Sequence, residues 1–141
     1  MNTTGDAELS VQDRLEILEL FARYSWAFDT GDADAYAAVF TEDGVMEGGS
    51  TRIAGRDELR AFVRRLWDPA VATQHWTTNH LLSGSSTACT SRCYLVEVES
   101  TEDEAHIALV GCYRDDLVRK PGGWHIAHRR FSPWEQRATI L

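Results

Sequence analysis

The sequence predicts a single α+β domain in which a strongly bent, mostly antiparallel sheet wraps around three helices of the N-terminal half as a half-open cone. Two observations predict this class. Up to Pro69, apolar residues recur at the three- and four-residue spacing of helices, and after it, segments rich in β-branched and aromatic residues alternate with short turn-like loops. A sheet bent around helices buries both apolar faces and leaves a cavity between them, where small-molecule sites commonly lie.

The first helix is expected to begin after Ser10, which together with Asp13 resembles a capping box, and to end near Thr30-Gly31. Small and apolar residues at helical spacing predict one inward face, made of Val11, Leu15, Leu18, Ala22 and Ser25. Asp29 falls in register with this face. The sequence therefore places a carboxylate in an apolar stripe, at the helix end where the macrodipole disfavours negative charge.

The rest of the chain divides into short elements. A second helix is expected over 34–40, followed by a turn at 41–44. Two short strands and a third helix follow, over 45–47, over 51–53 and from Gly55 onward. The four strands expected after Pro69 span 75–82, 88–98, 106–118 and 124–131. We expect this domain over 10–133, between a flexible N-terminus (1–9) and a C-terminal tail (134–141).

Composition narrows the class of protein. The chain has 141 residues, of which 43% are hydrophobic, enough for one domain with its own core. A net charge of −8 argues against nucleic-acid binding, which favours a basic surface. The sequence has no apolar run that predicts a membrane span and no recognisable signal peptide. Three cysteines without CxxC spacing fit free thiols, so we expect a cytoplasmic protein.

Asp29 needs a positive or hydrogen-donating partner if it is buried, and a histidine can supply one. A carboxylate bonded to one ring nitrogen fixes the tautomer and raises the basicity of the other nitrogen. The alternation of an undistorted strand places His75 and Asn79 on one face and Trp76 and His80 on the other, so only one histidine would reach a given pocket. The alternative is that the helix ends earlier and Asp29 is a turn residue.

Further candidates surround this pair. Tyr24 would present its phenol as a hydrogen-bond donor to a substrate oxygen, or would equally be a core aromatic residue. The same two interpretations apply to the aromatic residues that would line a pocket: Trp26, Tyr36, Phe40, Trp67, Tyr94 and Tyr113. The sequence has no cluster of His, Asp and Glu at metal-ligand spacing and no Gly-rich phosphate loop, so neither a metal nor a cofactor is expected.

The order of these motifs resembles a known family. The segments Ile17-x2-Leu20-x2-Arg23-Tyr24-x4-Asp29-x-Gly31-Asp32, Phe40-Thr41-x-Asp43-Gly44, Gly55-Arg56-Asp57-x-Leu59 and His75-x3-Asn79 are similar to those of SnoaL-like proteins in the nuclear transport factor 2-like superfamily. Further matches are Gly111-x-Tyr113-x-Asp115-x-Leu117-Val118-Arg119 and Gly123-Trp124-x-Ile126-x2-Arg129. The resemblance runs from about residue 10 to 133.

This resemblance implies a cone-shaped α+β barrel with an apolar central pocket, commonly a homodimer or homotrimer. In the dehydratase and dehydrochlorinase branches, an Asp late in the first helix orients a His on the strand after the third helix, and Asp29 and His75 stand at those positions. Tyr24 matches a tyrosine of bile-acid dehydratase. Arg129 stands where the dehydrochlorinase has a pocket arginine, although the neighbouring Arg130 competes for that place. Asn79, in the histidine motif, is expected to contact substrate.

The sequence thus favours a dehydratase- or isomerase-type enzyme that acts on a small apolar hydroxylated or carbonyl substrate, without a cofactor. His75 would be the general base, Asp29 its orienter and Tyr24 the acid. A polyketide-type cyclase would use the same pair. A non-catalytic ligand-binding or assembly domain would keep Asp29 and His75 as a buried structural pair, since fold membership alone does not confer activity.

Overall fold

The computed structural model describes residues 6–139, and side chains through residue 136. Within these residues the helices are α1 (Val11–Asp29), α2 (Ala33–Ala38), α3 (Arg56–Leu66) and a final 3-10 helix η1 (Trp134–Thr139). The strands are β1 (Phe40–Gly48), β2 (Thr51–Ala54), β3 (Ala72–Gly84), β4 (Ala88–Ser100), β5 (Ala105–Lys120) and β6 (Gly123–Pro133).

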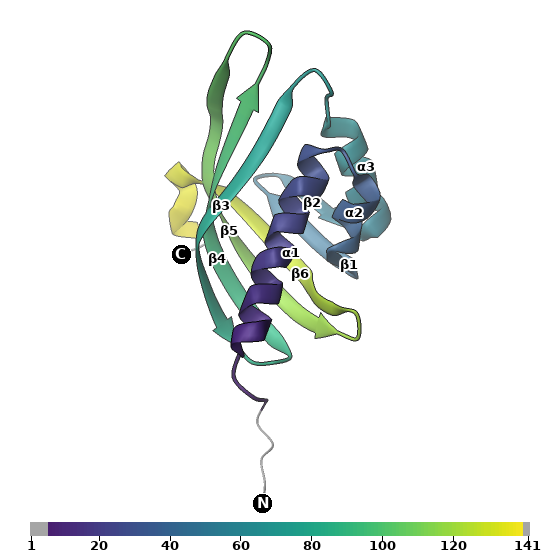
Figure 1. Cartoon of the computed structure of the whole chain (residues 1–141), viewed down its shortest axis with the longest axis vertical. Coiled ribbons are helices and arrows are strands. Elements are labelled where there is room, and N and C mark those ends of the chain that lie inside the picture. The colour runs from purple at the N-terminus through teal and green to yellow at the C-terminus, as the bar shows by residue number, and fades with distance from the viewer. Residues whose placement is uncertain (1–5, 140–141) are drawn as a thin grey trace, which may run out of the picture.

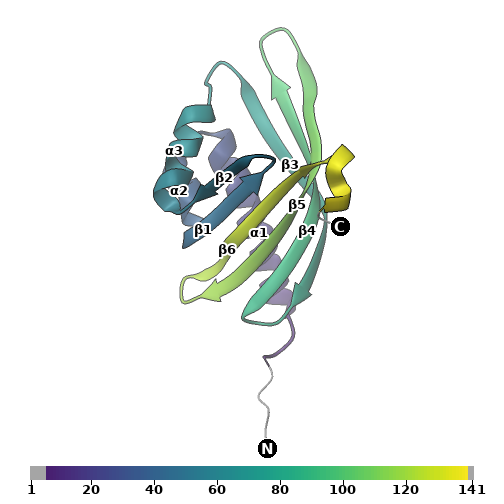
Figure 2. The same ribbon diagram turned by 180° about the vertical axis from the view of Figure 1, so that it is seen from behind.

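The strands form one curved sheet in the order β2-β1-β6-β5-β4-β3. All neighbouring pairs are antiparallel except β1 and β6, which run parallel. Helix α1 crosses the concave face of the sheet, and α2 and α3 stand beside β1 and β2 (Figures 1 and 2). This arrangement confirms the predicted α+β cone, because the helices cover one face of a sheet that bends around them.

The inward face of α1 differs from the predicted one. Its buried side chains are Asp13, Ile17, Leu20, Phe21, Tyr24, Ser25 and Ala27. Of the predicted stripe only Ser25 is buried, whereas Leu15 is 58% exposed. Two apolar stripes run along this helix, and the one with the larger side chains faces the sheet because it removes more apolar surface from water. Asp29 therefore does not lie at the centre of the buried stripe.

The start of the helix agrees with the sequence prediction. The Ser10 hydroxyl accepts a hydrogen bond from the Asp13 amide, and the Asp13 carboxylate accepts one from the Ser10 amide. The same carboxylate contacts the Arg119 guanidinium and the Trp124 indole N–H. The cap of α1 is therefore also its attachment to the β5–β6 hairpin.

Strand β1 begins earlier than predicted. The segment 41–44, predicted as a turn, belongs to the strand, and α2 ends at Ala38 rather than at Phe40. Phe40 pairs with Ile126, and the pairing register with β6 then shifts before Val45. Gly44 fits this distortion because a Cβ there would lie 2.7 Å from the Cβ of Phe40.

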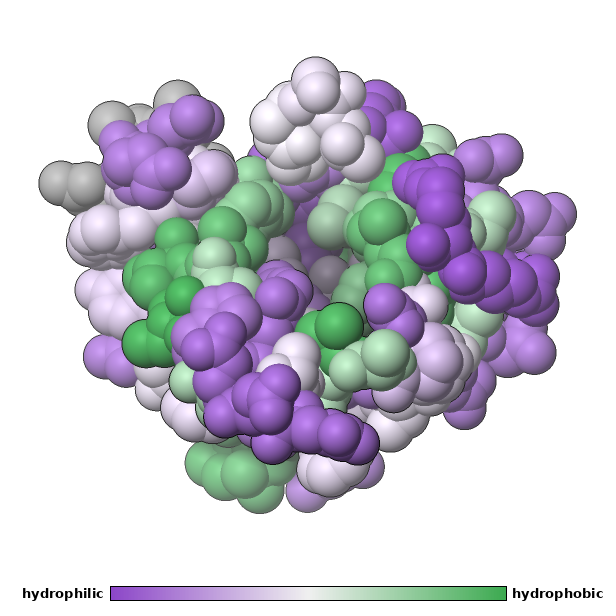
Figure 3. Space-filling view, turned by 90° about the horizontal axis from the view of Figure 1, so that it is seen from above, coloured by the Kyte–Doolittle hydropathy of each residue, from purple (hydrophilic) through white to green (hydrophobic). Residues whose placement is uncertain are grey.

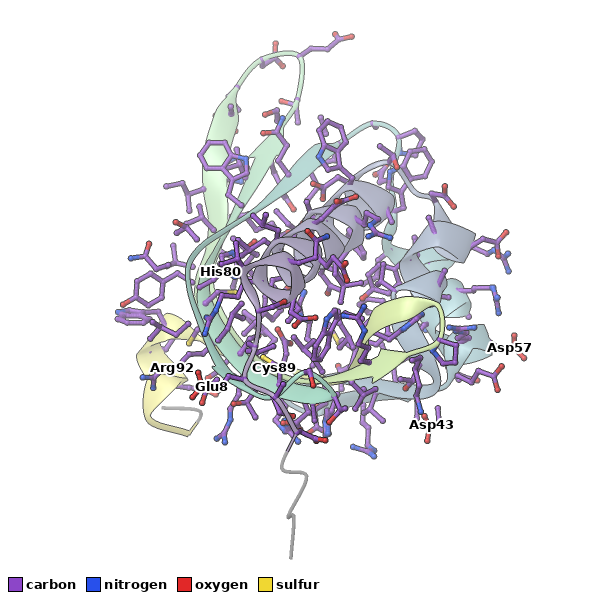
Figure 4. All side chains as sticks on the ribbon, turned by 60° about the horizontal axis from the view of Figure 1, so that its bottom comes forward. Glu8, Asp43, Asp57, His80, Cys89 and Arg92 are labelled. Atoms are coloured by element: carbon purple, nitrogen blue, oxygen red, sulfur yellow. The ribbon has the colours of Figure 1, made fainter. Side chains whose placement is uncertain are left out.

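Strand β3 is not regular, and this overturns the prediction that only one of its histidines faces inward. Its register with β4 shifts between Thr78 and Leu81, and Asn79 has a φ of 59°. The extra residue in this bulge reverses the alternation of the strand. His80 consequently turns towards α1, where its ring stacks on Phe21 (Figure 4).

Both ends of the described chain pack on the domain. Glu8 forms an isolated β-bridge with Ser85, and Leu9 is buried. Helix η1 contacts β5 and β6. The predicted flexible N-terminus (1–9) and C-terminal tail (134–141) are described only in part. Residues 1–5 of the first and residues 140–141 of the second lie outside the described residues. Among the described helices, none is long and apolar enough to cross a membrane, and the cytoplasmic location stays a prediction.

Candidate active site

Asp29 and His75 meet, as the sequence predicted, where the end of α1 lies beside the edge strand β3. Nδ1 of His75 donates to Oδ1 of Asp29 over 2.6 Å, and the backbone N–H of His75 donates to Oδ2 of the same carboxylate over 3.0 Å. Asp29 thus holds both the ring and the main chain of His75. The Phe28 ring also contacts the imidazole edge-to-face, with centroids 5.0 Å apart.

A second carboxylate stands on the other side of the imidazole. Glu97 is paired with His75 in the β3–β4 register, and its Oε2 lies 3.4 Å from Nε2 of His75. Burial raises the pKa of Glu97, an effect to which the charges of Glu99 and Asp29 add and which His75 opposes. The imidazole therefore lies between two carboxylates, Asp29 at Nδ1 and Glu97 at Nε2.

His75 and Glu97 line a cavity of about 330 Å³ between the helices and the sheet. Its other lining residues are Tyr24, Phe28, Met46, Phe62, Leu66, Thr73, Leu95, Glu99, Leu109, Tyr113 and Phe131. Figure 3 looks onto this end of the molecule and shows a hollow bordered by hydrophobic residues, with hydrophilic residues on the rim. The size and the mostly apolar lining suit a small ring compound.

Three tyrosines pack together beneath the cavity. The Tyr36 hydroxyl donates to the Tyr24 hydroxyl over 3.2 Å, and the Tyr24 and Tyr113 rings meet edge-to-face. Burial raises the pKa of Tyr36 and of Tyr113 far above that of a free phenol. Both stay neutral phenols, so their hydroxyls can donate hydrogen bonds at any ordinary pH.

Arg129 lies behind this aromatic wall, because it does not line the cavity and its side chain is 0% exposed. Its Nε and Nη2 donate to the two oxygens of Asp115, each over 2.8 Å, and Ser91 donates to the same carboxylate. The guanidinium carbon lies 4.1 Å and 4.0 Å from the ring centroids of Tyr24 and Tyr113. The substrate-binding role expected for Arg129 is thus replaced by that of a buried cation that packs against two cavity-lining rings.

The other expected binding residues lie away from the cavity, except Tyr113. Trp26 is 72% exposed on the opposite side of α1, and Tyr94 is 45% exposed because its neighbours on β4 take the inward positions. Trp67 donates its indole N–H to the Asp29 carbonyl, over 3.2 Å. Asn79 sits exposed in the β3 bulge, and Tyr36 and Phe40 are fully buried in the core. The core interpretation of the aromatic residues therefore applies to Tyr36 and Phe40.

Residues that the sequence prediction left out of the site complete it. Leu95, Glu97 and Glu99 alternate along β4 and all line the cavity, which is the inward pattern of a strand. That two-residue spacing was the available signal for both glutamates. Phe28 and Phe62 carried only the general signal of apolar residues on a helix.

A larger groove of about 730 Å³ lies on the other side of α1, between the exposed Trp26 and the β5–β6 hairpin. Its lining includes Arg23, Arg119 and His125 but has no carboxylate–histidine chain like that of His75.

His80 lines a third cavity, at the β3 bulge, and burial lowers its pKa. Among residues 6–139, no three His, Cys, Asp or Glu side chains are grouped to hold a metal ion. We therefore place the candidate site at His75.

The geometry defines a class of protein: an α+β cone of the nuclear transport factor 2-like type, with a carboxylate–histidine pair at its apolar cavity. The chain belongs to the SnoaL-like domain family, whose model matches residues 9–130. No curated protein matches the sequence.

Solved structures agree with this assignment. A protein of unknown function from Mycobacterium tuberculosis is 33% identical, with a TM-score of 0.79 over 86% of this chain and 76% of that one. An NTF2-like protein with a cystatin-like fold from Novosphingobium aromaticivorans is 26% identical, with a TM-score of 0.84 over 93% and 90%. ActVI-ORFA from Streptomyces coelicolor is 23% identical, with a TM-score of 0.78 over 85% and 96%, and shares the fold.

Proposed function

We propose that the protein is a dehydratase- or isomerase-type enzyme that removes a proton next to a carbonyl or leaving group of a small, largely apolar ring substrate. The observation that carries the proposal is the placement of His75, whose Nδ1 is held by Asp29 while the ring lines the cavity beside Glu97. A base needs a fixed tautomer, which the Asp29 contact at Nδ1 supports, and a second ring nitrogen at the cavity, which is Nε2 beside Glu97.

The proposed step starts with Nε2 of His75, which takes a proton from a carbon atom next to the substrate carbonyl. The electron pair of that C–H bond moves towards the carbonyl and gives an enolate. Asp29 and Glu97 stabilise the imidazolium that forms, because each lies against one ring nitrogen. In a dehydration, the enolate expels a β-hydroxyl group, which leaves as water after it receives a proton from an acid.

Tyr24 is the proposed acid or hydrogen-bond donor to the oxygen on which charge develops. It lines the cavity, and Tyr36 donates to its hydroxyl, so the Tyr24 proton is left for another acceptor. The Arg129 guanidinium, which is paired with Asp115, packs against its ring with the guanidinium carbon 4.1 Å from the ring centroid. Proton transfer of this kind involves no redox change and calls for no cofactor.

Two alternatives use the same residues. A polyketide-type cyclase would form a carbon–carbon or carbon–oxygen bond from the same enolate, but a cavity of about 330 Å³ favours a smaller substrate. A non-catalytic binding domain would use Asp29 to satisfy the backbone N–H of an edge strand, which is what its Oδ2 does. The following experiment separates enzymatic proton abstraction from non-catalytic binding.

The test uses two bicyclic probes: 2-tetralone, whose activated C–H protons exchange with D₂O, and 3-hydroxy-1-tetralone, which loses water to give 1-naphthol. We expect the wild-type protein to accelerate at least one reaction, followed by NMR and by naphthol fluorescence. His75→Gln should lose ~10²–10⁴-fold of that acceleration and Glu97→Gln less. His125→Gln, on the β5–β6 hairpin away from this cavity, is the matched control. No acceleration on either probe, or full activity of His75→Gln, would overturn the proposal.

A further inference from the structure

The cavity wall carries an unbalanced charge. Along the inward face of β4, Leu95 is followed by Glu97 and then by Glu99, so the wall turns from apolar to acidic towards the end of the strand. Among the described residues, His75 is the only other charged or readily protonated side chain that lines the cavity, apart from the tyrosines. The lining contains neither lysine nor arginine.

The nearest cations do not cancel this charge. The Arg129 guanidinium is separated from the cavity by the Tyr24 and Tyr113 rings and is neutralised by Asp115. Arg65 lies over the Phe62 ring, with its guanidinium carbon 5.8 Å from the centroid, and is exposed to solvent. His106, whose Nε2 lies 3.7 Å from Oε2 of Glu99, is half exposed. Glu99 therefore faces the cavity without a buried positive partner.

Aromatic and acidic groups together favour a cation. Ring faces attract an ammonium group through their quadrupole, and carboxylates attract it through charge. Phe62 and Phe131 stand in the same lining as the two glutamates, and Thr73, directly opposite Glu99 in the β3–β4 register, adds a hydroxyl. A ligand carboxylate in the same place would be repelled by Glu99 and would meet neither a lysine nor an arginine.

We propose that the substrate is a ring compound that carries an ammonium group, and that Glu99 is the residue that selects it. Two residues along a strand span roughly 7 Å, so an ammonium at Glu99 would lie about that far from the carbon that reacts at His75. The inference rests on the proposed function in that it takes the same cavity as the substrate site. Binding tests it directly, without turnover.

The experiment compares three naphthalenes of similar shape: 2-(aminomethyl)naphthalene, 2-naphthalenemethanol and 2-naphthoate. Calorimetric titration of the wild-type protein should rank the amine tightest and the carboxylate weakest, and salt should weaken the amine alone. Glu99→Gln should reduce amine affinity about 2–5-fold, because the Glu99 side chain is 37% exposed, and should leave the affinity for the alcohol unchanged. Glu102→Gln, an exposed acid in the β4–β5 loop, should change none of the three.

The inference is overturned if the carboxylate binds as well as the amine, if Glu99→Gln leaves the amine affinity unchanged, or if none of the three compounds binds. His75→Gln separates the two proposals, because it should abolish tetralone chemistry and keep the order of affinities. If the protein acts on the tetralones but does not prefer the amine, only this inference fails. If it prefers the amine but does not act on the tetralones, only the proposed function fails.

Discussion

Glu97 Oε2 lies 3.4 Å from Nε2 of His75, on the neighbouring strand and in direct register with it. The imidazole is thereby placed between two carboxylates, of which only Asp29 was predicted as its partner. Since burial raises the pKa of Glu97, this carboxylate is costly to ionise in the folded protein. Carboxylates whose pKa is shifted by burial and neighbouring charges are common at functional sites.

The raised pKa of Glu97 predicts how stability depends on pH. Between its ordinary value of 4.5 and the higher value in the folded state, the folded protein binds more protons than the unfolded chain, so this contribution to stability falls as pH rises. Glu97→Gln removes that loss. We expect its melting temperature to match the wild type near pH 4.5 and to exceed it by about 1–4 °C at pH 8.

Differential scanning calorimetry across this pH range measures the effect. Glu102→Gln is the control, since Glu102 is exposed in the β4–β5 loop and should give a difference that does not change with pH. If the Glu97→Gln protein is no more stable than the wild type at pH 8, other groups of the folded protein stabilise the ionised Glu97, and the prediction is wrong.

The buried pair of Arg129 and Asp115 predicts strong coupling. Both side chains are 0% exposed and joined by two hydrogen bonds, so removal of one leaves a buried charge without its partner. Arg129→Met should destabilise the protein by about 3–5 kcal/mol, and Asp115→Leu by a similar amount. The double variant should be more stable than the sum of the single losses implies. Urea denaturation of the four proteins measures this coupling, and strictly additive losses would contradict it.

The observed inward face of α1 predicts different losses of stability for substitutions at two neighbouring positions. Ile17 is fully buried, whereas Leu15 is mostly exposed. Ile17→Ala should lower the free energy of unfolding by about 2–5 kcal/mol through the cavity it creates. Leu15→Ala should change it by no more than about 0.5 kcal/mol. Chemical denaturation distinguishes them, and the reverse order would restore the face predicted from the sequence.

The outer face of the sheet predicts self-association. Leu81, Tyr94 and Val110 are exposed on adjacent strands β3, β4 and β5, and exposed apolar patches on sheets commonly mark interfaces. We expect a homodimer or homotrimer that covers this face. Leu81→Asp combined with Tyr94→Asp should shift the mass measured by light scattering towards the monomer, while Leu15→Asp on α1 should not. A wild-type protein that stays monomeric at every concentration would exclude this interface.

The sequence by itself determined the class of fold and the meeting of Asp29 with His75. Helical spacing before Pro69 and strand-forming segments after it were local signals, and the capping box at Ser10 depends on residues three apart. The spacing of the family motifs was sufficient to select His75 over His80. Such patterns are predictable because they arise from contacts between residues close in sequence, or from an order of motifs along the chain.

Only the tertiary structure decided which residues surround the pair. The buried stripe of α1 depended on which of two stripes removes more surface against the sheet, and the turn of His80 towards Phe21 depended on a bulge in β3. The burial of Arg129 required Asp115, which lies directly opposite it on the neighbouring strand β5. Glu97 reached His75 because β4 lies beside β3 in one register. These relations depend on how distant segments pack, and no local pattern specifies them.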